Sequence, residues 1–362
     1  MQRILEPGEI ASLDASAMPR IRLPERPSVF LSRAQRLRAL AEGNAISGYL
    51  RLMAAVVDAQ HAMLIASPAP TIDDASLQLA LTHGMPVIPA VGTSLDPTWR
   101  DTLRDLTIRI RDSIRADRLL TDSVPAVIAQ LDRLDALPKA ELDSLATALL
   151  EQDLDNVDVA LAPFVYAALQ VMWTRSACAL NLTQIPYLDA PGLCPVCGSS
   201  PVASIIRIGG VHEGYRYLQC SLCATEFHFV RVKCANCDST KGIAYQSLDS
   251  LENANEVGNT KEADQKGPNA NPAGAANAKR GFQGDGRTTS SAPQSIRPTR
   301  AESCDECHTY LKIFAQEKLF DAEPFADDLA SLPLDLMMNE AGYSRAHPHP
   351  FLWPATTPES DA

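Results

Sequence analysis

Four Cys-x-x-Cys pairs constrain the fold of this chain more than any other feature. They account for eight of its nine cysteines: Cys194/Cys197, Cys220/Cys223, Cys234/Cys237 and Cys304/Cys307. Two intervening residues let one tight turn present both thiolates to the same ion, with the backbone N–H groups of the turn directed at the sulfur atoms. Each pair can therefore supply half of a tetrahedral metal site.

The alternatives to metal binding are redox dithiols and disulfides. A single Cys-x-x-Cys pair in a cytosolic protein would not distinguish a metal site from a redox dithiol. Here four pairs occur together, and the first ten residues contain a proline and two acids where a signal peptide would need an apolar core. We therefore expect a cytoplasmic protein whose thiolates stay reduced and hold metal ions.

An internal repeat indicates which pairs share an ion. Cys-Pro-Val-Cys-Gly-Ser-Ser at 194–200 recurs as Cys-Ala-Asn-Cys-Asp-Ser-Thr at 234–240, and a β-prone run follows each copy. The closing pairs, at 220–223 and 304–307, both lead into apolar or aromatic residues typical of strands. The repeat predicts a first site of Cys194, Cys197, Cys220 and Cys223, and a second of Cys234, Cys237, Cys304 and Cys307. Interleaved sites are the alternative.

The spacing leaves the choice of metal open, because zinc and iron both accept four thiolates in a tetrahedron. The first pair resembles a rubredoxin knuckle, with Gly198 at a position that needs a left-handed backbone. The other three pairs place Ala224, Asp238 and His308 there. Asp and His tolerate that conformation better than Ala does.

Other candidate ligands are explained more simply. Cys178 lies in an apolar stretch and is expected to be a buried small hydrophobic residue. Three histidines close to the pairs could each replace a cysteine, but eight thiolates already complete two tetrahedra, so we expect them beside the sites or on the surface. They are His212, His228 and His308.

Nothing in the sequence indicates an enzyme. His347 and His349 form a His-Pro-His pair that we assign to a solvated tail. Acid pairs could suggest general acid/base catalysis, yet no nucleophile, glycine-rich phosphate loop or dinucleotide motif accompanies them. Helix N-termini and solvated faces account for these acid pairs, which are Asp73/Asp74, Asp153/Asp155 and Asp327/Asp328.

The charge and hydropathy of the chain argue against nucleic acid and membranes as binding partners. The net charge is −12, and residues 191–248, which hold the first three pairs, carry +2. Four thiolates around a divalent ion contribute about −2 per site, so this segment lacks the basic face that nucleic acid requires. The most apolar stretch, 159–173, contains Pro163 and Gln170 and is shorter than the roughly 20 residues that a bilayer needs. We predict a buried helix there and no membrane insertion.

The fold class is predicted as α+β and multidomain: an N-terminal all-α helical domain, two small rubredoxin- or zinc-ribbon-like four-cysteine modules, and a C-terminal helix. Apolar periodicity predicts helices between about 32 and 62, broken near Gly43 and Gly48, and at 73–83, 98–116, 124–137, 139–151 and 157–182. The expected parts are an arm (1–28), the helical domain (29–182), a linker (183–193), the first ribbon (194–233), the second ribbon (234–318), and a C-terminal helix with a tail (319–362).

The second ribbon contains a compositionally distinct insert at 249–300. It is rich in Asn, Ala, Gly, Ser and Pro, with Phe282 its only aromatic residue, so we expect it to be disordered. After the last pair, 309–314 is a strand candidate and 325–343 a helix with an irregularity at Pro333. The apolar residues of the proline-rich tail, Phe351, Leu352 and Trp353, suggest that this tail docks on the protein.

Taken together, these segments resemble one family. The first pair, the run Arg216-Tyr-Leu-Gln-Cys-Ser-Leu-Cys through Cys237, and Cys304-Asp-Glu-Cys-His-Thr-Tyr-Leu closely resemble the formate dehydrogenase accessory protein FdhE. The helical half and the ending around Asp327/Asp328, Gly342-Tyr343 and Pro350-Phe351-Leu352 are similar as well. This chain departs from the family pattern in its long insert between Cys237 and Cys304, which leaves the geometry of the second site open.

The resemblance implies a cytoplasmic, non-catalytic maturation factor. Such a protein would carry iron at rubredoxin-like sites, with zinc possible, and would recognise the catalytic subunit of a respiratory formate dehydrogenase before export. Two other functions stay open. One is that of a rubredoxin-like electron-transfer or redox-sensing protein, and the other is that of a zinc-ribbon module that binds nucleic acid. The acidic net charge argues against nucleic-acid binding.

Overall fold

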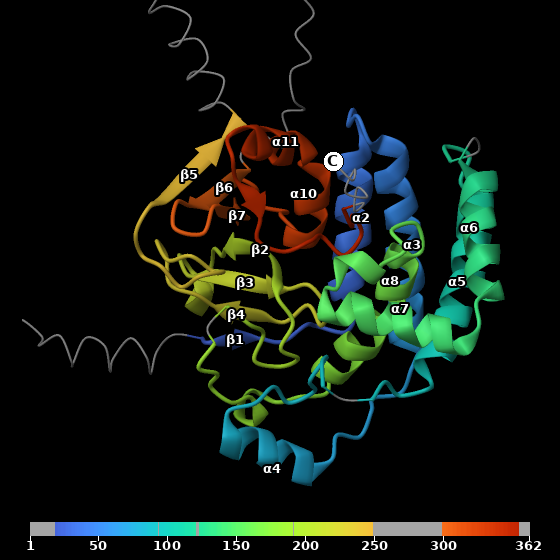
Figure 1. The fold of residues 1–362 in the computed structure, drawn as a ribbon, viewed down its shortest axis with the longest axis horizontal. Helices are drawn as coiled ribbons and strands as arrows, with labels where there is room; N and C mark the ends of the chain where they lie inside the picture. Colours follow the sequence, from blue (N-terminus) through green and yellow to red (C-terminus); the bar gives the residue numbers. More distant parts are fainter. Residues whose placement is uncertain (1–18, 93, 121–122, 191, 249–298, 355–362) are drawn as a thin grey trace, which may run out of the picture.

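The computed structural model describes residues 19–92, 94–120, 123–190, 192–248 and 299–354 of the 362-residue chain. Helices α2, α3 and α5 to α8 lie to one side of a sheet, α4 lies beyond the β1 edge of the sheet, and α10 and α11 pack on the sheet itself (Figure 1). The helices are α2 (Val29–Ala41), α3 (Ser47–Ala66), α4 (Asp74–His83), α5 (Trp99–Ala116), α6 (Val124–Ala136), α7 (Lys139–Glu151), α8 (Ala162–Ala177), α10 (Pro324–Ala330) and α11 (Leu332–Glu340). The strands are β1 (Ile21–Arg22), β2 (Pro201–Ile206), β3 (Arg216–Cys220), β4 (Glu226–His228), β5 (Ile243–Ser247), β6 (Arg300–Cys304), β7 (Thr309–Ala315) and β8 (Ser344–Arg345).

The predicted helices of the first half are confirmed, with shifted ends. The break near Gly43 separates α2 from α3, and Asp73 caps α4 by accepting a hydrogen bond from the backbone N–H of Ser76 at 2.9 Å. Helix α8 is shorter than predicted, because Pro163 lies in its first turn and Cys178 already caps its C-terminus. It is the buried helix that the hydropathy predicted, and α3, α5 and α7 pack around it.

Two expectations about this half need correction. The predicted N-terminal arm contributes to the sheet, because Ile21 and Arg22 pair antiparallel with Phe227 and Glu226 of β4. Cys178 is half-buried at the helix end rather than buried within it, and its Sγ lies 3.3 Å from the carbonyl oxygen of Pro24. None of the described helices combines the length and apolar character that crossing a membrane requires.

The strands of both cysteine modules belong to one sheet rather than to two separate modules. In the described residues the order is β1-β4-β3-β2-β7-β6-β5, with β8 beside β7. The modules join where β2 pairs parallel with β7, with Ser204 opposite Ile313. Elsewhere along this order neighbouring strands are antiparallel. The largest hydrophobic cluster runs from the helices into this sheet, so ribbons and helices share a core.

The C-terminal acid pair is buried, which corrects the expectation of a solvated face. Asp327 is 2% exposed and accepts hydrogen bonds from Arg36 of α2, at 2.6 Å from Nη2 and 2.9 Å from Nε. Asp328 is fully buried and contacts Arg345 and the ammonium group of Lys312. Buried charges must be paired, so these contacts fasten the C-terminal helices to α2 and to the sheet.

The C-terminal tail packs on the protein, as its apolar residues predicted. The prediction that His349 lies in a solvated segment is wrong. Phe351 and Trp353 are buried. His349 is 1% exposed, and its ring lies 4.4 Å from that of Phe325. The predicted long C-terminal helix is divided at Ser331, just before Pro333, into α10 and α11.

Most of the predicted insert lies outside the described residues. Its last two residues are described and are ordered into the sheet region: Thr299 is buried, and Arg300 begins β6. The prediction of disorder is therefore wrong for these two residues. At the other side, Ser247 ends β5 opposite Arg300.

Candidate metal centres

The structure brings the first four cysteines together as the repeat predicts. The Sγ atoms of Cys194 and Cys223 are 3.6 Å apart, and those of Cys197 and Cys220 are 3.3 Å apart. All four lie within 4.8 Å of one another. A tetrahedron with metal–sulfur distances of about 2.3 Å has edges of about 3.8 Å, whereas a disulfide needs about 2.05 Å. The four sulfurs therefore fit one metal ion and do not form disulfides.

The second group has the same geometry despite the long insert. The Sγ atoms of Cys234 and Cys307 are 3.7 Å apart, and those of Cys237 and Cys304 are 3.6 Å apart. These four sulfurs also lie within 4.8 Å of one another. The interleaved arrangement of pairs is therefore not the one that the fold produces. We refer to the two groups as the first and second cysteine clusters.

The turns that hold the sulfurs have the conformation that the sequence required. Gly198, Ala224, Asp238 and His308 follow the second cysteine of each pair, and all have positive φ angles, of 78°, 59°, 64° and 52°. The backbone N–H groups of Leu222 and Cys223 both lie 3.4 Å from the sulfur of Cys220, and the third pair repeats this pattern at 3.4 and 3.5 Å. Such N–H groups stabilise negative charge on sulfur, which favours metal ligation.

The electrostatics of the first cluster also fit a cation. Burial raises the pKa of the Cys194 and Cys220 thiols well above the ordinary cysteine value. Burial acts the same way on Cys197, but hydrogen bonds from the neighbouring thiols lower its pKa. Burial therefore opposes ionisation of Cys194 and Cys220. A divalent cation would allow all four to ionise, because its charge compensates theirs.

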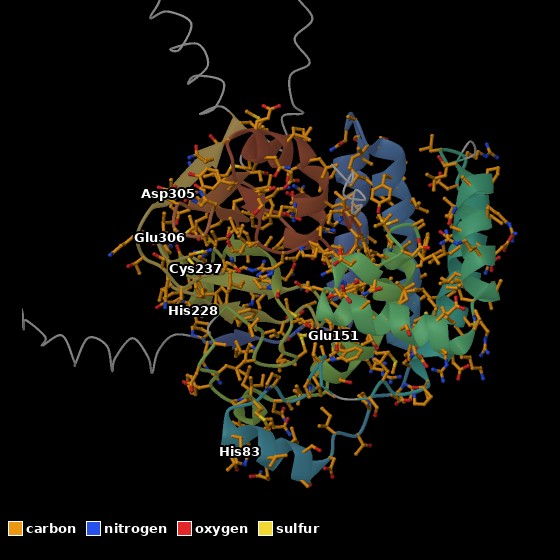
Figure 2. All side chains as sticks on the ribbon, in the orientation of Figure 1. His83, Glu151, His228, Cys237, Asp305 and Glu306 are labelled. Carbon is orange, nitrogen blue, oxygen red and sulfur yellow. The ribbon has the colours of Figure 1, made fainter. Side chains whose placement is uncertain are left out.

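The two clusters differ in solvent access. The first is enclosed: its four cysteines are at most 1% exposed. In the second cluster Cys237 is exposed and Cys307 is half-buried. Figure 2 shows Cys237 at the outer margin of the ribbons, on the same side as Asp305 and Glu306. The second cluster is thus the one that a solute can reach.

The nearby histidines lie outside both clusters. Nδ1 of His212 is 3.0 Å from the hydroxyl oxygen of Tyr217, and the ring of His228 packs edge-on against Tyr215 and Tyr217. His308 is exposed at the left-handed position of its turn. Within the described residues, the groups able to hold a metal ion consist of cysteine alone.

A buried ion pair connects the two modules. Nη2 of Arg216, at the start of β3, lies 2.8 Å from Oε1 of Glu302 on β6; β3 ends at Cys220 of the first cluster and β6 ends at Cys304 of the second. Both side chains are at most 3% exposed, and the guanidinium also lies 5.3 Å from the ring centre of Phe229. Sequence patterns could not reveal this pair, because its members are 86 residues apart.

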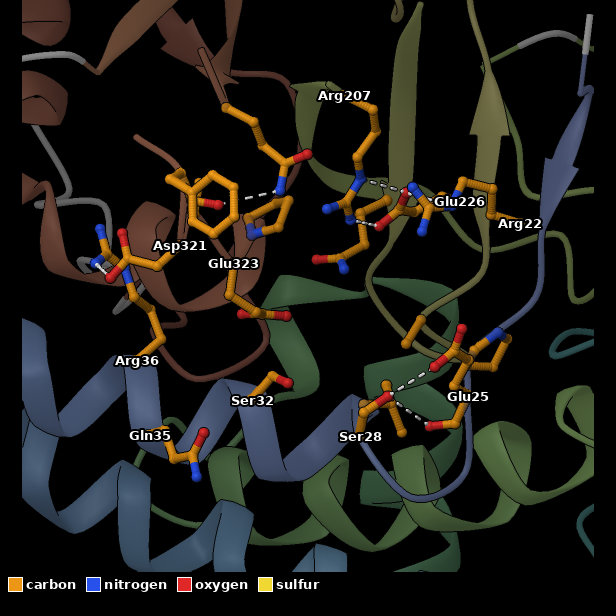
Figure 3. Close-up of a pocket in the computed structure, with 18 of the residues that line it drawn as sticks. Arg22, Glu25, Ser28, Ser32, Gln35, Arg36, Arg207, Glu226, Asp321 and Glu323 are labelled. Carbon is orange, nitrogen blue, oxygen red and sulfur yellow. Dashed lines mark hydrogen bonds and ion pairs between the residues drawn. The ribbon is translucent and has the colours of Figure 1, made fainter. Parts of the chain in front are cut away.

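A polar cavity of about 570 Å³ lies where α2, β1 and the start of α10 meet (Figure 3). Its arginines are already engaged: Arg207 donates to Glu226 at 2.9 Å, and Arg36 donates to Asp321 at 2.6 Å. The cavity walls come from both ends of the chain, which is why no local motif predicted it. Because its charged side chains are paired with one another, we assign no reaction to this cavity.

Comparison with known proteins gives a consistent result. Family models for FdhE match residues 18–189 (N-terminal), 193–231 (central domain) and 283–352 (C-terminal domain). The FdhE homolog of Cronobacter sakazakii is 33% identical over 356 residues, covering 97% of this chain and 98% of that protein. FdhE of Escherichia coli O127:H6 shows the same identity and coverage. The crystal structure of FdhE from Pseudomonas aeruginosa superposes with a TM-score of 0.69 at 32% identity, covering 93% of this chain and 99% of that one.

Proposed function

Because the chain belongs to the FdhE family, we propose that it is a non-catalytic accessory protein for a respiratory formate dehydrogenase. In this proposal it works in the cytoplasm, where it holds the immature catalytic subunit. The observation that carries the proposal is the pair of four-cysteine clusters set in one sheet, in a chain that matches the family over nearly its whole length.

We propose that all eight clustered cysteines are metal ligands and that the native ion is iron, with zinc as the alternative. Thiolate tetrahedra suit both ions, so the donor set supports a metal without choosing between them. When bound, the ion supplies fixed cross-links between turns. In small ribbons that cross-link provides much of the folding free energy.

The shared sheet supports a role for the metal in partner binding. The first cluster closes the turn after β3 and the turn before β2, and β2 carries β7 of the other module. Loss of the first ion would therefore disturb the strands of both modules. We infer that the loaded ribbons form or orient the surface that binds the catalytic subunit.

A cysteine variant tests this proposal. Cys194→Ser combined with Cys197→Ser should remove one metal equivalent and abolish capture of the catalytic subunit, while α2–α8 retain their circular dichroism. Cys178→Ser is the matched control, because Cys178 lies outside both clusters and should leave metal content and capture unchanged. If a variant with all eight clustered cysteines replaced by serine still bound the subunit with wild-type affinity, the metal ribbons would not be the recognition element.

A second function, electron transfer or redox sensing, is favoured by the exposure of Cys237. A buried cluster cannot exchange electrons with a partner as readily as one at the surface. Iron-loaded protein would then show a reversible change of visible absorbance between its chemically oxidised (ferric) and reduced (ferrous) states, and Cys237→Ser would remove the part contributed by the second cluster. Absence of such a change in iron-loaded wild type would exclude this function.

A further inference from the structure

One face of the sheet carries an apolar groove outside both clusters. Side chains alternate along β7: Tyr310 and Lys312 contact Asp335 of α11, so Ile313 points to the opposite face. There Ile313 forms the floor of a groove of about 270 Å³, with Ile206 and Tyr245 among the residues that line it. Ligand pockets usually measure about 300–1,000 Å³, so this groove, the ribbon groove, fits one large side chain better than a whole small molecule.

The segment after β4 forms one wall of the ribbon groove. It crosses this face of the sheet, where the guanidinium of Arg216 donates to the carbonyl oxygens of Val230 and Lys233 at 3.5 and 3.4 Å. Val232 lines the groove, is 53% exposed and has a φ of +57°. A β-branched residue in the left-handed region is strained, and such strain persists where the surroundings enforce it, often at binding sites. The fold thus keeps the apolar side chain of Val232 at the rim of the groove, although valine disfavours this left-handed backbone conformation.

The rim is basic. Arg231, Arg300 and Lys318 line the groove and are exposed, and none of its lining residues is acidic. Arg231 donates to the carbonyl oxygen of Gly214 rather than to a carboxylate. Across the described part of the chain, none of the three forms an ion pair. The protein has a net charge of −12, so three cationic side chains around the ribbon groove make this part of the surface differ in charge from the protein as a whole. Salt screens charges beyond about 8 Å, so the rim acts on groups that contact it rather than at a distance.

We propose that the ribbon groove binds a linear acidic peptide segment of a partner protein. One apolar side chain of leucine or phenylalanine size fills the groove, and Asp or Glu residues on either side of it pair with Arg231, Arg300 and Lys318. The identity of the partner rests on the proposed function: it is the catalytic subunit. The chemistry of the groove does not depend on that identity.

Anisotropy titration of metal-loaded, full-length protein tests the groove. The probe is fluorescein-labelled Glu-Asp-Leu-Phe-Asp-Glu, and its counterpart is Lys-Lys-Leu-Phe-Lys-Lys. The acidic peptide should bind saturably, with a Kd below about 1 mM, and the basic one should not. Arg300→Glu with Lys318→Glu should weaken binding at least tenfold. Arg109→Glu with Arg115→Glu, on the exposed side of α5, makes the same change of net charge and should have less than a twofold effect.

Three results would overturn the proposal: no saturable binding of the acidic peptide, equal binding of both peptides, or undiminished binding by the groove variant. Capture of the catalytic subunit is measured separately. Wild type should capture the subunit, and the affinity of the Arg300→Glu/Lys318→Glu protein for it should be at least tenfold lower. Equal capture by both proteins would overturn the assignment of the subunit to this groove. If wild type captures no subunit at all, the proposed function fails. The peptide titration alone then decides whether the ribbon groove binds acidic peptides.

Discussion

Acidification should unfold this protein partly through His349, which the tail buries against α10. Its Nε2 lies 3.0 Å from the carbonyl oxygen of Phe325, and its Nδ1 accepts a hydrogen bond from the backbone N–H of Phe351 at 3.0 Å. This pattern requires the neutral ring, because a protonated Nδ1 would oppose the N–H of Phe351. Burial lowers the pKa of His349 to about 3, although Asp328, 3.9 Å away, acts in the opposite direction.

The size of the effect follows from proton linkage. An unfolded histidine has a pKa of about 6.5, so below that pH the unfolded chain binds a proton that the folded one does not. Stability contributed by His349 is present above about pH 6.5 and is lost as the pH falls towards 3. With about 1.36 kcal/mol per pKa unit, the loss between pH 7.5 and pH 5 is about 2 kcal/mol.

Urea unfolding at pH 7.5 and pH 5 measures this loss. His349→Gln retains a donor but cannot be protonated, so its free energy of unfolding should fall by about 2 kcal/mol less than that of wild type over this interval. Comparing the two proteins cancels the pH dependence of the cysteine clusters, which both contain. His83→Gln, at the exposed end of α4, is the control and should behave like wild type. Equal pH dependence in wild type and His349→Gln would show that the buried His349 ring does not cause the loss of stability on acidification.

Two more predictions concern the clusters and their turns. Zinc-loaded protein treated with excess chelator should lose one equivalent of zinc quickly, from the second cluster, which contains exposed Cys237. The other equivalent should leave roughly a thousandfold more slowly, because reaching the first cluster requires opening the core at a cost of about 4–5 kcal/mol. Cys234→Ser should abolish the fast phase, and release of both ions in a single phase would contradict the difference in burial. Ala224→Gly, at a φ of 59°, should raise the free energy of unfolding by roughly 0.5–1 kcal/mol, while Ala129→Gly, at an exposed position in the middle of helix α6, should lower it by about 1 kcal/mol. Thermal unfolding measures both changes, and destabilisation by Ala224→Gly would show that the left-handed turn is not strained.

Local chemistry was readable in the sequence. The repeated pairs predicted how the eight sulfurs group, and the glycine-like position predicted the left-handed backbone at Asp238 and His308. Both features depend on residues within a few positions of each other, where turn geometry is set by sterics and hydrogen bonds. Apolar periodicity located the helices for the same reason, with errors mostly at their ends.

Long-range pairing was not readable. The acid pair at Asp327 and Asp328 was assigned to a solvated face because its partner Arg36 is 291 residues from Asp327 along the chain. The parallel pairing of β2 with β7 unites two modules that the repeat presented as separate units. Burial of His349 likewise depends on Phe325 and on where the tail folds back. Partners of this kind are selected by the packed core, which no local pattern encodes.

The register of β5 with β6 makes the second ribbon tolerant of added sequence. Because Ser247 is directly opposite Arg300, the chain leaves the sheet and returns to it at neighbouring points. The entropy of closing such a loop grows with the logarithm of its length, at about 0.6 kcal/mol per doubling. Cys304 lies at the far end of this strand pair, opposite Ile243, and Cys237 lies in the turn that precedes β5, so the distance between their sulfurs depends on the strand pairing and not on the length of the segment that joins β5 to β6. An affinity tag or a fluorescent protein inserted between β5 and β6 would therefore report on the protein in cells while leaving the sulfur tetrahedron intact.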